Sequence, residues 1–412
     1  MTRLQILETE ASAAAAKGNL PKAENLCRLA LEEDPGAVWA MTLLGKVALG
    51  IGQAQFARRY FAEAAALAPD SSATIANLAW VENQPVADPA PLLEEERYLL
   101  IKAWGQGFWS DVSHVIGQLL LAEITVRTPV VHWGANSRFG DGGDANLFPY
   151  FFEPIGEVDI DELVCSEWDY FPPKWNAENL HDNELNIWEG PYSRMSALYF
   201  LNRTERVAIS DFYTGVSDLS PWIPPDHPLY GESVERLYRY LVKKYLRPSA
   251  AIRKEIDAFY DQRLAGLPYI SVHVRGSDKV KEQSDLGDVN DLYFTVLDDY
   301  LRQDPECNIF LFTDDNRVLK RFVDHYGDKV IFTDCDRTDT DDGVHVAQKI
   351  DPRRLGVEVI IDAYLAARGL GFVGNGASNV SCMVVHLNDW RDGEYTLLAP
   401  SRHDHDPFLH NW

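Results

Sequence analysis

The sequence lacks several features that mark whole classes of protein. Its 412 residues include only five cysteines, with no CxxC spacing, which argues against a disulfide framework or a zinc site. No run approaches the roughly 18 uncharged apolar residues of a membrane-spanning helix. The amino terminus has no apolar stretch followed by a cleavage site, so we expect a cytoplasmic protein without a membrane span.

Basic residues are also scarce. Lysine and arginine number 38 against 63 aspartates and glutamates, a net charge of −25, and this excess repels phosphate backbones and anionic lipid. General nucleic-acid binding is therefore not expected. Hydrophobic residues make up 46% of the chain and aromatic residues 11%, which is enough for full cores, and the length favours two or three domains at about 150 residues each.

An internal repeat occupies the first part of the chain. Five residues recur 34 positions later: Gly18, Ala23, Cys27, Ala30 and Pro35 return as Gly52, Ala57, Phe61, Ala64 and Pro69. This period resembles tetratricopeptide repeats. A third start near Ile75 and the linker-like residues 85–91 predict a helical module at 1–84, used either for packing or homodimer contacts or as a groove for a protein partner.

A β-α-β unit is predicted where the repeat ends. Residues 97–103 and 128–133 are typical of buried strands, and residues 110–125 place apolar side chains on one helical face. Gly105 and Gly107 lie between the first strand and the helix, where they allow a tight turn or the close approach of a ligand. With an amphipathic helix predicted at 229–246, we assign a first Rossmann-like domain to 92–248.

Residues 151–190 combine carboxylates with aromatic rings. The stretch has eleven carboxylates, one basic residue and seven aromatic residues. Rings and carboxylates can hold the CH faces and hydroxyls of a sugar, and the same composition also suits a solvated excursion with aromatic anchors. Both interpretations stay open.

Strand and helix patterns alternate between residues 268 and 388. Strands are predicted at 268–274, 308–313, 329–333 and 370–374, and helices at 290–303, 315–326, 352–368 and 377–386. This alternation predicts the α/β class, with a parallel sheet covered by helices on both faces. We assign a second Rossmann-like domain to 249–395 and a C-terminal tail to 396–412.

Polar clusters follow each predicted strand of this second domain. His273–Lys279 end the first strand, Asp314 and Asp315 end the second, residues 334–351 follow the third, and Gly374–Ser378 follow the fourth. The carboxyl ends of parallel strands share one edge of a sheet, where open α/β sheets bind ligands. The four loops are therefore expected to form a nucleotide site.

Each cluster suits one part of a nucleotide sugar. Arg275 offers a planar fork for a diphosphate, and Lys279 offers a second cation. Gly376 and Ser378 lie at the start of the last helix, where free N–H groups favour a phosphate. Four further side chains can bind a ribose, a base or a sugar: His273, Asp314, Asp315 and Asp362.

Four stretches resemble a known family. Residues 273–280 (HVRGSDKV), 310–315 (FLFTDD) and 355–380 (LGVEVIIDAYLAARGLGFVGNGASNV) are similar to three motifs of the α1,6-fucosyltransferase superfamily, which is related to protein O-fucosyltransferases. Residues 104–118 (WGQGFWSDVSHVIGQ) resemble its amino-terminal glycine loop.

The resemblance implies a GT-B enzyme that transfers L-fucose from GDP-β-L-fucose to a glycan or protein hydroxyl, with inversion and without a metal or cofactor. Carried over by position, the donor contacts would be Arg275 for the β-phosphate, His273 and Asp362 for the guanosine, Asp314 and Asp315 for the donor region, and Ser378 for the phosphates. In the first domain, which would bind the acceptor, Gly105, Gly107 and His114 are the corresponding candidates.

The chain departs from the family at two positions. Core-type members often have a second arginine where this chain has Gly276, and a candidate base glutamate where it has Gln283. A carboxylate within reach of the acceptor hydroxyl is needed for general-base help. The remaining candidates are Asp278 and Glu282, with Asp111 or His114 of the first domain as alternatives.

Other interpretations stay open. Tetratricopeptide repeats also precede the GT-B core of O-GlcNAc-type transferases, which use UDP-GlcNAc, and a guanosine site can accept another sugar such as GDP-mannose. The two departures are also compatible with an inactive repeat scaffold. The acidic residues 334–342 could hold a metal, but they lack the closing glutamate of an EF-hand, so we expect a surface loop.

Overall fold

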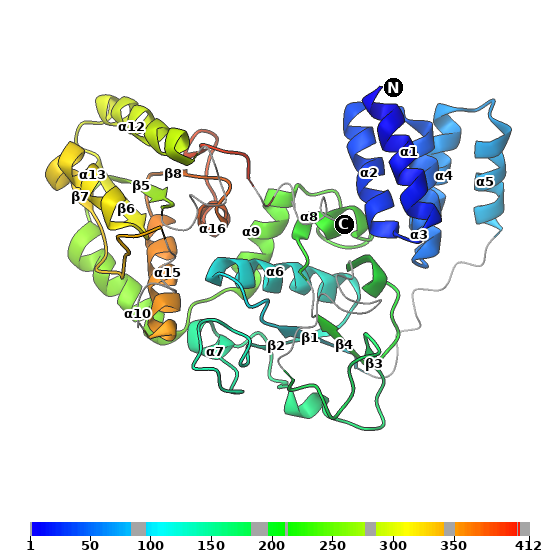
Figure 1. Cartoon of the computed structure of the whole chain (residues 1–412), viewed down its shortest axis with the longest axis horizontal. Helices are drawn as coiled ribbons and strands as arrows, with labels where there is room; N and C mark the ends of the chain where they lie inside the picture. Colours follow the sequence, from blue (N-terminus) through cyan, green and yellow to red (C-terminus); the bar gives the residue numbers. More distant parts are fainter. Residues whose placement is uncertain are drawn as a thin grey trace.

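The computed structural model describes residues 2–83, 96–182, 197–210, 213–276, 286–341, 351–401 and 403. In these ranges the chain folds into a helical module and two α/β lobes (Figure 1). Of the predicted site residues, Asp278, Lys279 and Glu282 lie outside the described ranges, as does Gln283. None of the helices in these ranges combines the length and the apolar character that a bilayer crossing needs.

The first five helices form the module, drawn in blue in Figure 1. The repeated alanines are buried, together with the larger Cys27 and Phe61, because small side chains let neighbouring helices approach. Gly18 and Gly52 have matching φ angles of 76° and 73°. The tetratricopeptide assignment itself stays a prediction. The helices are α1 (Arg3–Ala16), α2 (Leu20–Glu33), α3 (Val38–Gly50), α4 (Ala54–Leu67) and α5 (Ser72–Glu82).

The module packs against the first lobe around Trp222. This side chain is fully buried, and its indole nitrogen donates to Glu24 Oε1 of α2 at 2.8 Å. Its ring lies edge-on to Phe56 of α4, with ring centroids 5.1 Å apart. Arg28 binds the same Glu24 oxygen at 2.6 Å and lies over the Trp222 ring. This face of α2 and α4 is therefore used for packing within the chain.

Parallel strands form the sheet of the first lobe, in the order β2-β1-β4-β3. The strands are β1 (Tyr98–Lys102), β2 (Thr128–His132), β3 (Tyr170–Phe171) and β4 (Val207–Ser210). Helix α6 (Phe108–Ile124) connects β1 to β2, which confirms the predicted β-α-β unit, whereas β3 and β4 were not predicted. The other helices are α7 (Phe148–Phe151), η1 (Asp161–Leu163), η2 (Ala197–Phe200), α8 (Val216–Leu219), η3 (Ser220–Trp222) and α9 (Val234–Tyr245).

The sheet of the second lobe is also parallel, in the order β7-β6-β5-β8-β9, which confirms the α/β class. Its strands are β5 (Tyr269–Val274), β6 (Asn308–Thr313), β7 (Val330–Ile331), β8 (Gly371–Gly374) and β9 (Tyr395–Leu397). Its helices are α10 (Ala250–Phe259), η4 (Tyr260–Leu264), α12 (Leu286–Gln303), α13 (Asn316–Tyr326), η5 (Gly327–Lys329), α15 (Pro352–Ala366) and α16 (Asn379–Leu387). Strand β9 was missed, and it crosses the boundary predicted at 395/396.

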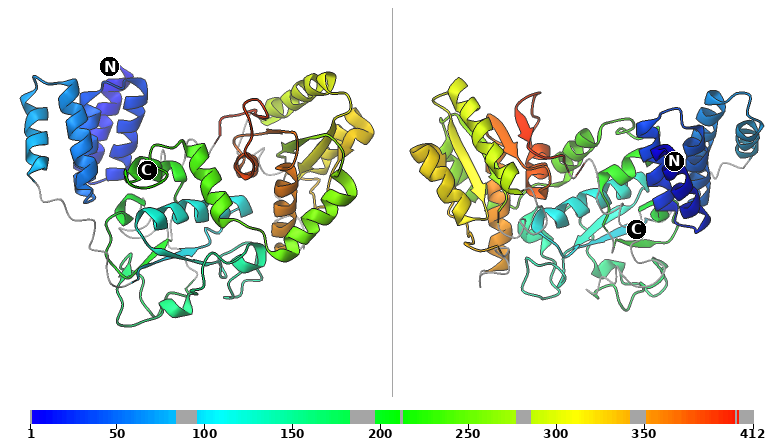
Figure 2. Two further views of the ribbon diagram at one scale, coloured as in Figure 1. Left: turned by 180° about the vertical axis from the view of Figure 1, so that it is seen from behind. Right: turned by 45° about the horizontal axis from the view of Figure 1, so that its top comes forward.

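Successive side chains of β5 point to opposite faces of this sheet, and helices cover both faces. Ile270, Val272 and Val274 pack with buried residues of α12 and α13, whereas Tyr269 packs with α10, α15 and α16 on the opposite face. His273 has the same parity as Tyr269 and therefore points to the face covered by α16. The two views in Figure 2 show these helices on opposite sides of the sheet.

The carboxyl edges of the two sheets meet at one junction. Helices α6 and α15 both begin at such an edge, and Phe108 of α6 lies against Gly356 of α15. Arg353 Nη2 of α15 pairs with Asp141 Oδ2, in the loop after β2, at 2.7 Å. Loops and helices at the carboxyl edges of both sheets therefore contact one another at this junction.

One residue of the predicted C-terminal tail, His403, contacts both lobes. After β9, His403 is buried against the first lobe, with its Nε2 3.2 Å from Ser113 Oγ of α6. Its Nδ1 is 3.0 Å from His386 Nε2 of α16, and its ring stacks on Tyr238 of α9 at 4.6 Å. This contact joins the lobes, so residue 403, within the predicted C-terminal tail, is part of the packed structure.

We expect Trp222→Ala to loosen the module from the first lobe. The change removes a buried indole and leaves Glu24 without its indole donor, so the free energy of unfolding should fall by about 3–5 kcal/mol. Hydrogen exchange should accelerate in α2 and α4 more than in β6. Ile75→Ala, at a half-exposed site on α5, is the control and should change stability by less than about 0.5 kcal/mol. Unchanged exchange in α2 and α4 would show that Trp222 does not anchor the module.

Candidate active site

An ion pair joins the ends of β5 and β6. Val274 and Thr313, the last residues of these strands, are paired in register, so Arg275 and Asp314 follow them side by side. Arg275 Nη1 donates to Asp314 Oδ2 at 2.5 Å, and the backbone N–H of Gly276 donates to Asp314 Oδ1 at 3.0 Å. The side chains are 27% and 15% exposed. The predicted arginine is therefore held next to a predicted aspartate at a surface that solvent reaches.

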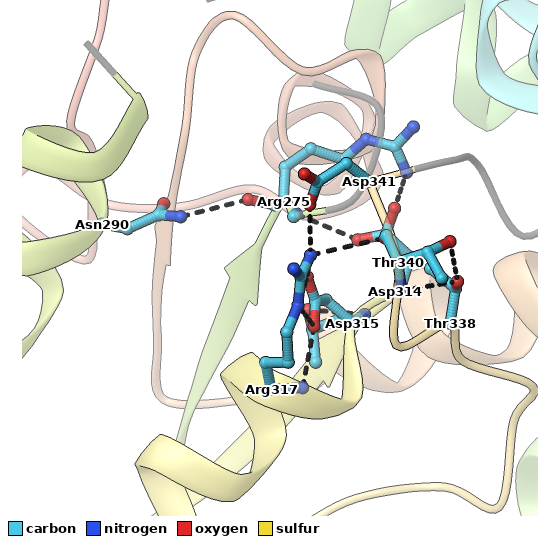
Figure 3. A network of polar contacts seen from close by, with 10 residues as sticks. Arg275, Asn290, Asp314, Asp315, Arg317, Thr338, Thr340 and Asp341 are labelled. Carbon is cyan, nitrogen blue, oxygen red and sulfur yellow. Dashed lines mark hydrogen bonds and ion pairs between the residues drawn. The ribbon is translucent and has the colours of Figure 1, made fainter. Parts of the chain in front are cut away.

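The loop after β7 is hydrogen-bonded to the same place. Thr338 N donates to the Asp314 carbonyl at 2.9 Å, and Asn316 N donates to the Thr338 carbonyl at 3.0 Å. Arg317 extends the network, since its guanidinium binds Asp315 and also Asp341 at 2.8 Å. Figure 3 shows this network from Arg275 to Asp341. Three of the four predicted loops therefore meet directly.

Asp315 has a structural role in this network. It is 3% exposed, it caps the start of α13 by accepting from Arg317 N, and Arg317 binds both of its oxygens. A Cβ at Gly276 would lie 2.6 Å from the Asp315 Cβ. Glycine at 276, the first departure from the family pattern, is therefore the residue that this packing requires.

His273 connects β5 to the fourth loop. It is 4% exposed, its Nδ1 lies 2.6 Å from Ser381 Oγ of α16, and Ser381 Oγ also accepts from Asn375 N at 3.0 Å. Burial, and then the charge of Arg275, lower the pKa of His273 to about 3, opposed by Asp314. The ring is thus neutral and lies beneath the loop that contains Asn375.

Asp362 is buried under the loop after β7. Its Oδ1 accepts from the Thr333 hydroxyl at 2.6 Å, and it is 6% exposed. Burial raises the pKa of Asp362 to about 6, while the Thr333 hydrogen bond and Arg337 lower it and Glu358 raises it further. A carboxylate with few partners in a buried place is a strong acceptor for an amide or amino group.

The start of α16 is covered by the chain that follows β9. Ser378 is the N-cap residue of α16 and is 6% exposed. The carbonyl oxygens of Ala399 and Pro400 lie against Gly376, 2.1 and 2.5 Å from where a Cβ would be, and Leu398 N donates to the Gly374 carbonyl at 2.9 Å. The glycine-rich loop is therefore part of a packed corner that the sequence did not predict.

In the first lobe, Gly105 and Gly107 lie in the turn between β1 and α6. Gly105 has φ 79°, a conformation that favours glycine, and a Cβ at Gly107 would meet no atom within 4 Å. Asp111 closes the turn by accepting from Gln106 N at 2.9 Å and Gly105 N at 3.3 Å. Arg138 Nε donates to the Gly105 carbonyl at 2.7 Å.

Neither first-lobe candidate for the general base is accessible. Asp111 is fully buried, and burial raises its pKa to about 7, opposed by the N–H groups of the turn. His114 is 1% exposed, and burial lowers its pKa to about 3, opposed by a backbone hydrogen bond with Lys102. Direct contact of either side chain with a substrate hydroxyl is therefore not expected in this conformation.

Three residues that were not predicted from the sequence hold the predicted site side chains in place. Arg317 binds Asp315, Thr333 donates to Asp362, and Ser381 is hydrogen-bonded to His273. The contact of Arg317 could be predicted from the sequence, because Arg317 lies two positions after Asp315, which begins a helix. Thr333 and Ser381 contact residues far away in the sequence, so no local pattern predicts these contacts. Within the described ranges, no group of three or more His, Cys, Asp or Glu side chains could hold a metal ion.

Comparison with known proteins gives one sequence relative and matching solved structures, while no family model matches the chain. The chain is 26% identical over 295 residues to nodulation protein Z of Sinorhizobium fredii, covering 67% of this chain and 84% of that protein. The structure of NodZ α-1,6-fucosyltransferase co-crystallised with GDP matches with a TM-score of 0.50 and 20% identity, covering 71% of this chain and 92% of that one. Fucosyltransferase NodZ from Bradyrhizobium matches with the same score and identity, over 71% and 93%.

These matches indicate a glycosyltransferase. The structural matches establish a shared fold of the fucosyltransferase GT-B kind, and the sequence match over most of both chains supports the fucosyltransferase superfamily. This agrees with the family that the sequence motifs resemble.

We expect Gly276→Ala to destabilise the protein. The new methyl group would meet Asp315, which Arg317 holds in place, so the free energy of unfolding should fall by about 1–3 kcal/mol. Gly287→Ala is the matched control, because a Cβ at that helical position meets nothing within 4 Å. Urea denaturation measures both, and equal stability of the two variants would contradict the packing described for Gly276.

Proposed function

We propose that the protein transfers L-fucose from GDP-fucose to a hydroxyl of a glycan or protein, by a metal-independent inverting reaction. The observation that carries the proposal is the Arg275–Asp314 pair, partly exposed where the loops after β5, β6 and β7 meet. An arginine fork in this place suits a nucleoside diphosphate. The relative crystallised with GDP supports guanosine as the nucleoside.

Four predicted residues form the donor site in this proposal, three by contact and His273 by positioning. Arg275 binds the β-phosphate, oriented by Asp314. Asp362 accepts from the guanine amide or amino group, Ser378 binds a phosphate oxygen, and His273 acts through Ser381 by fixing the start of α16. For Asp362 and Ser378, which are nearly buried, binding requires the neighbouring loops to move apart.

The reaction is a single displacement. The oxygen of the acceptor hydroxyl forms a bond to C1 of fucose while the bond from C1 to the β-phosphate oxygen breaks, and the electron pair of that bond stays on GDP. Arg275 stabilises the charge that develops on the departing phosphate, which is the kind of preorganised electrostatic help that lowers such barriers most. Inversion converts the β-linked donor into an α-fucoside.

The proton of the acceptor hydroxyl goes to a carboxylate in this proposal. Burial of Asp111 and His114 leaves Asp278 and Glu282 as the candidates, and both follow Arg275 closely in sequence. Replacement of each by its amide tests the role. Loss of transfer with retained GDP binding identifies the base, because a base contributes to the chemical step and not to nucleotide binding.

We expect a thermal-shift panel to distinguish the donor. GDP should raise the melting temperature of the wild type and UDP should not, and Arg275→Ala should weaken GDP binding at least about tenfold, since charged hydrogen bonds contribute about 1.5–3 kcal/mol each. The wild type should also turn over GDP-fucose but not GDP-mannose. This turnover should persist in the presence of EDTA, because the proposed reaction needs no metal. An equal response to UDP would favour UDP-GlcNAc as the donor. GDP binding without turnover of either sugar nucleotide would favour a scaffold.

The pKa of Asp362 predicts a pH dependence of GDP binding. Because this pKa is raised to about 6, ionisation of Asp362 lowers the stability of the free fold above that pH, and the cost disappears as the pH falls. Binding has the opposite dependence, since the guanine donors need the carboxylate. GDP affinity should fall as the pH falls through 6, by at most about tenfold per unit.

Isothermal titration of the wild type and Asp362→Asn between about pH 5 and pH 8 measures this difference, because the range extends to both sides of the pKa. The phosphate of GDP itself ionises near pH 6, and the variant shares that effect. The dependence should be steeper in the wild type. Identical curves would exclude contact between Asp362 and the nucleotide.

A further inference from the structure

Three aromatic rings lie together at the carboxyl edge of the first sheet. Trp104 follows β1 and Tyr213 follows β4, the neighbouring strand. Their ring centroids are 5.9 Å apart, and His114 of α6 lies 6.0 Å from Trp104 and 6.1 Å from Tyr213. Trp104 and Tyr213 are partly exposed, whereas His114 is buried. The cluster thus has two rings that reach the surface and one that supports them from within the lobe.

Three buried polar atoms at this edge of the sheet have no hydrogen-bond partner among the described residues. They are His114 Nδ1, Asn136 Oδ1 and Ser210 Oγ. Asn136 lies in the loop after β2, and its Nδ2 donates to the Ala103 carbonyl. Ser210 ends β4, and its register partner Ile101 packs in the core that contains α6. All three therefore lie at the same edge of the sheet as Trp104.

These atoms share a chemical preference. His114 is neutral, and its other nitrogen is the one available for the backbone hydrogen bond with Lys102, so Nδ1 is an acceptor. Asn136 Oδ1 is an acceptor, and Ser210 Oγ can accept. A buried polar atom without a partner costs about 1–3 kcal/mol. A group of acceptors is satisfied by a ligand that donates, as hydroxyl groups do, and not by a phosphate or a carboxylate.

Aromatic faces and hydroxyl donors together define a saccharide. A pyranose ring has CH faces that pack on aromatic rings and hydroxyls around its rim. We propose that Trp104 and Tyr213 form a platform for a pyranose of an oligosaccharide acceptor, with the buried acceptors of His114, Asn136 and Ser210 reached from its hydroxyls through water. This inference rests on the proposed function and names its acceptor as a glycan rather than a protein.

The position of Trp104 and Tyr213 suits the binding of an acceptor close to the donor. The loop after β2 that contains Asn136 continues to Asp141, which pairs with Arg353 at the start of α15. The same end of α15 follows the loop after β7 that contacts Asp314. A sugar on Trp104 therefore lies on the side of the first lobe that faces the donor loops of the second.

A glycan microarray with fluorescently labelled full-length protein and GDP tests the proposal. The wild type should bind a subset of the oligosaccharides, and Trp104→Ala should reduce the apparent affinity at least about tenfold, as the loss of an aromatic anchor does. Trp104→Phe keeps an aromatic face and should retain most of the binding. Trp80→Ala, which removes an exposed tryptophan from α5, is the matched control and should bind as the wild type does.

A GDP thermal shift on each variant separates the outcomes. Trp104→Ala should keep the shift, which shows that the fold and the donor site are intact. If the wild type lacks a GDP shift, the proposed donor is wrong, whereas loss of glycan binding in Trp104→Ala would still support the platform. Glycan binding that is equal in the wild type and Trp104→Ala would overturn the platform. A wild type that binds no glycan and transfers fucose to a protein would overturn it as well.

Discussion

The ion pair between Arg275 and Asp314 is the interaction on which the site depends. It joins the ends of two parallel strands, and the same aspartate accepts the N–H of Gly276 while its carbonyl accepts from Thr338. One residue therefore fixes three loops. A charged hydrogen bond of this kind is strong where water is partly excluded, and removal of either partner leaves a charge without its counterpart. Both side chains are partly exposed to solvent, as the proposed contact between Arg275 and a phosphate requires.

The two lobes are held in position by contacts outside this pair. The chain after β9 packs on the glycine-rich loop of the second lobe and then buries His403 against Ser113 of the first. The helical module is attached to the first lobe through Trp222. Several contacts therefore hold the carboxyl edges of the two sheets next to each other. In this arrangement a donor held by the second lobe and an acceptor held by the first can meet.

Much of this architecture was predictable because it depends on local patterns. Strands β5, β6 and β8 and their helices follow alternating hydrophobicity, and parallel pairing alone placed Arg275 beside Asp314. Strands β3, β4 and β9 were missed, and of these β3 and β9 have only two and three residues, which carry little pattern. The sequence also did not reveal which polar side chains would be buried. Asp315 was predicted as a ligand contact, yet its oxygens are used by Arg317 and by the start of α13, because burial is decided by packing across the whole fold.

The most direct measurement is a double-mutant cycle on GDP affinity. Isothermal titration would compare the wild type, Arg275→Ala, Asp314→Asn and the double variant. If Asp314 acts by orienting Arg275, its replacement should weaken binding in the wild type and have little effect once Arg275 is absent, so the two losses should not add. Additive losses, or GDP binding by Arg275→Ala that equals the wild type, would contradict a donor site organised around this ion pair.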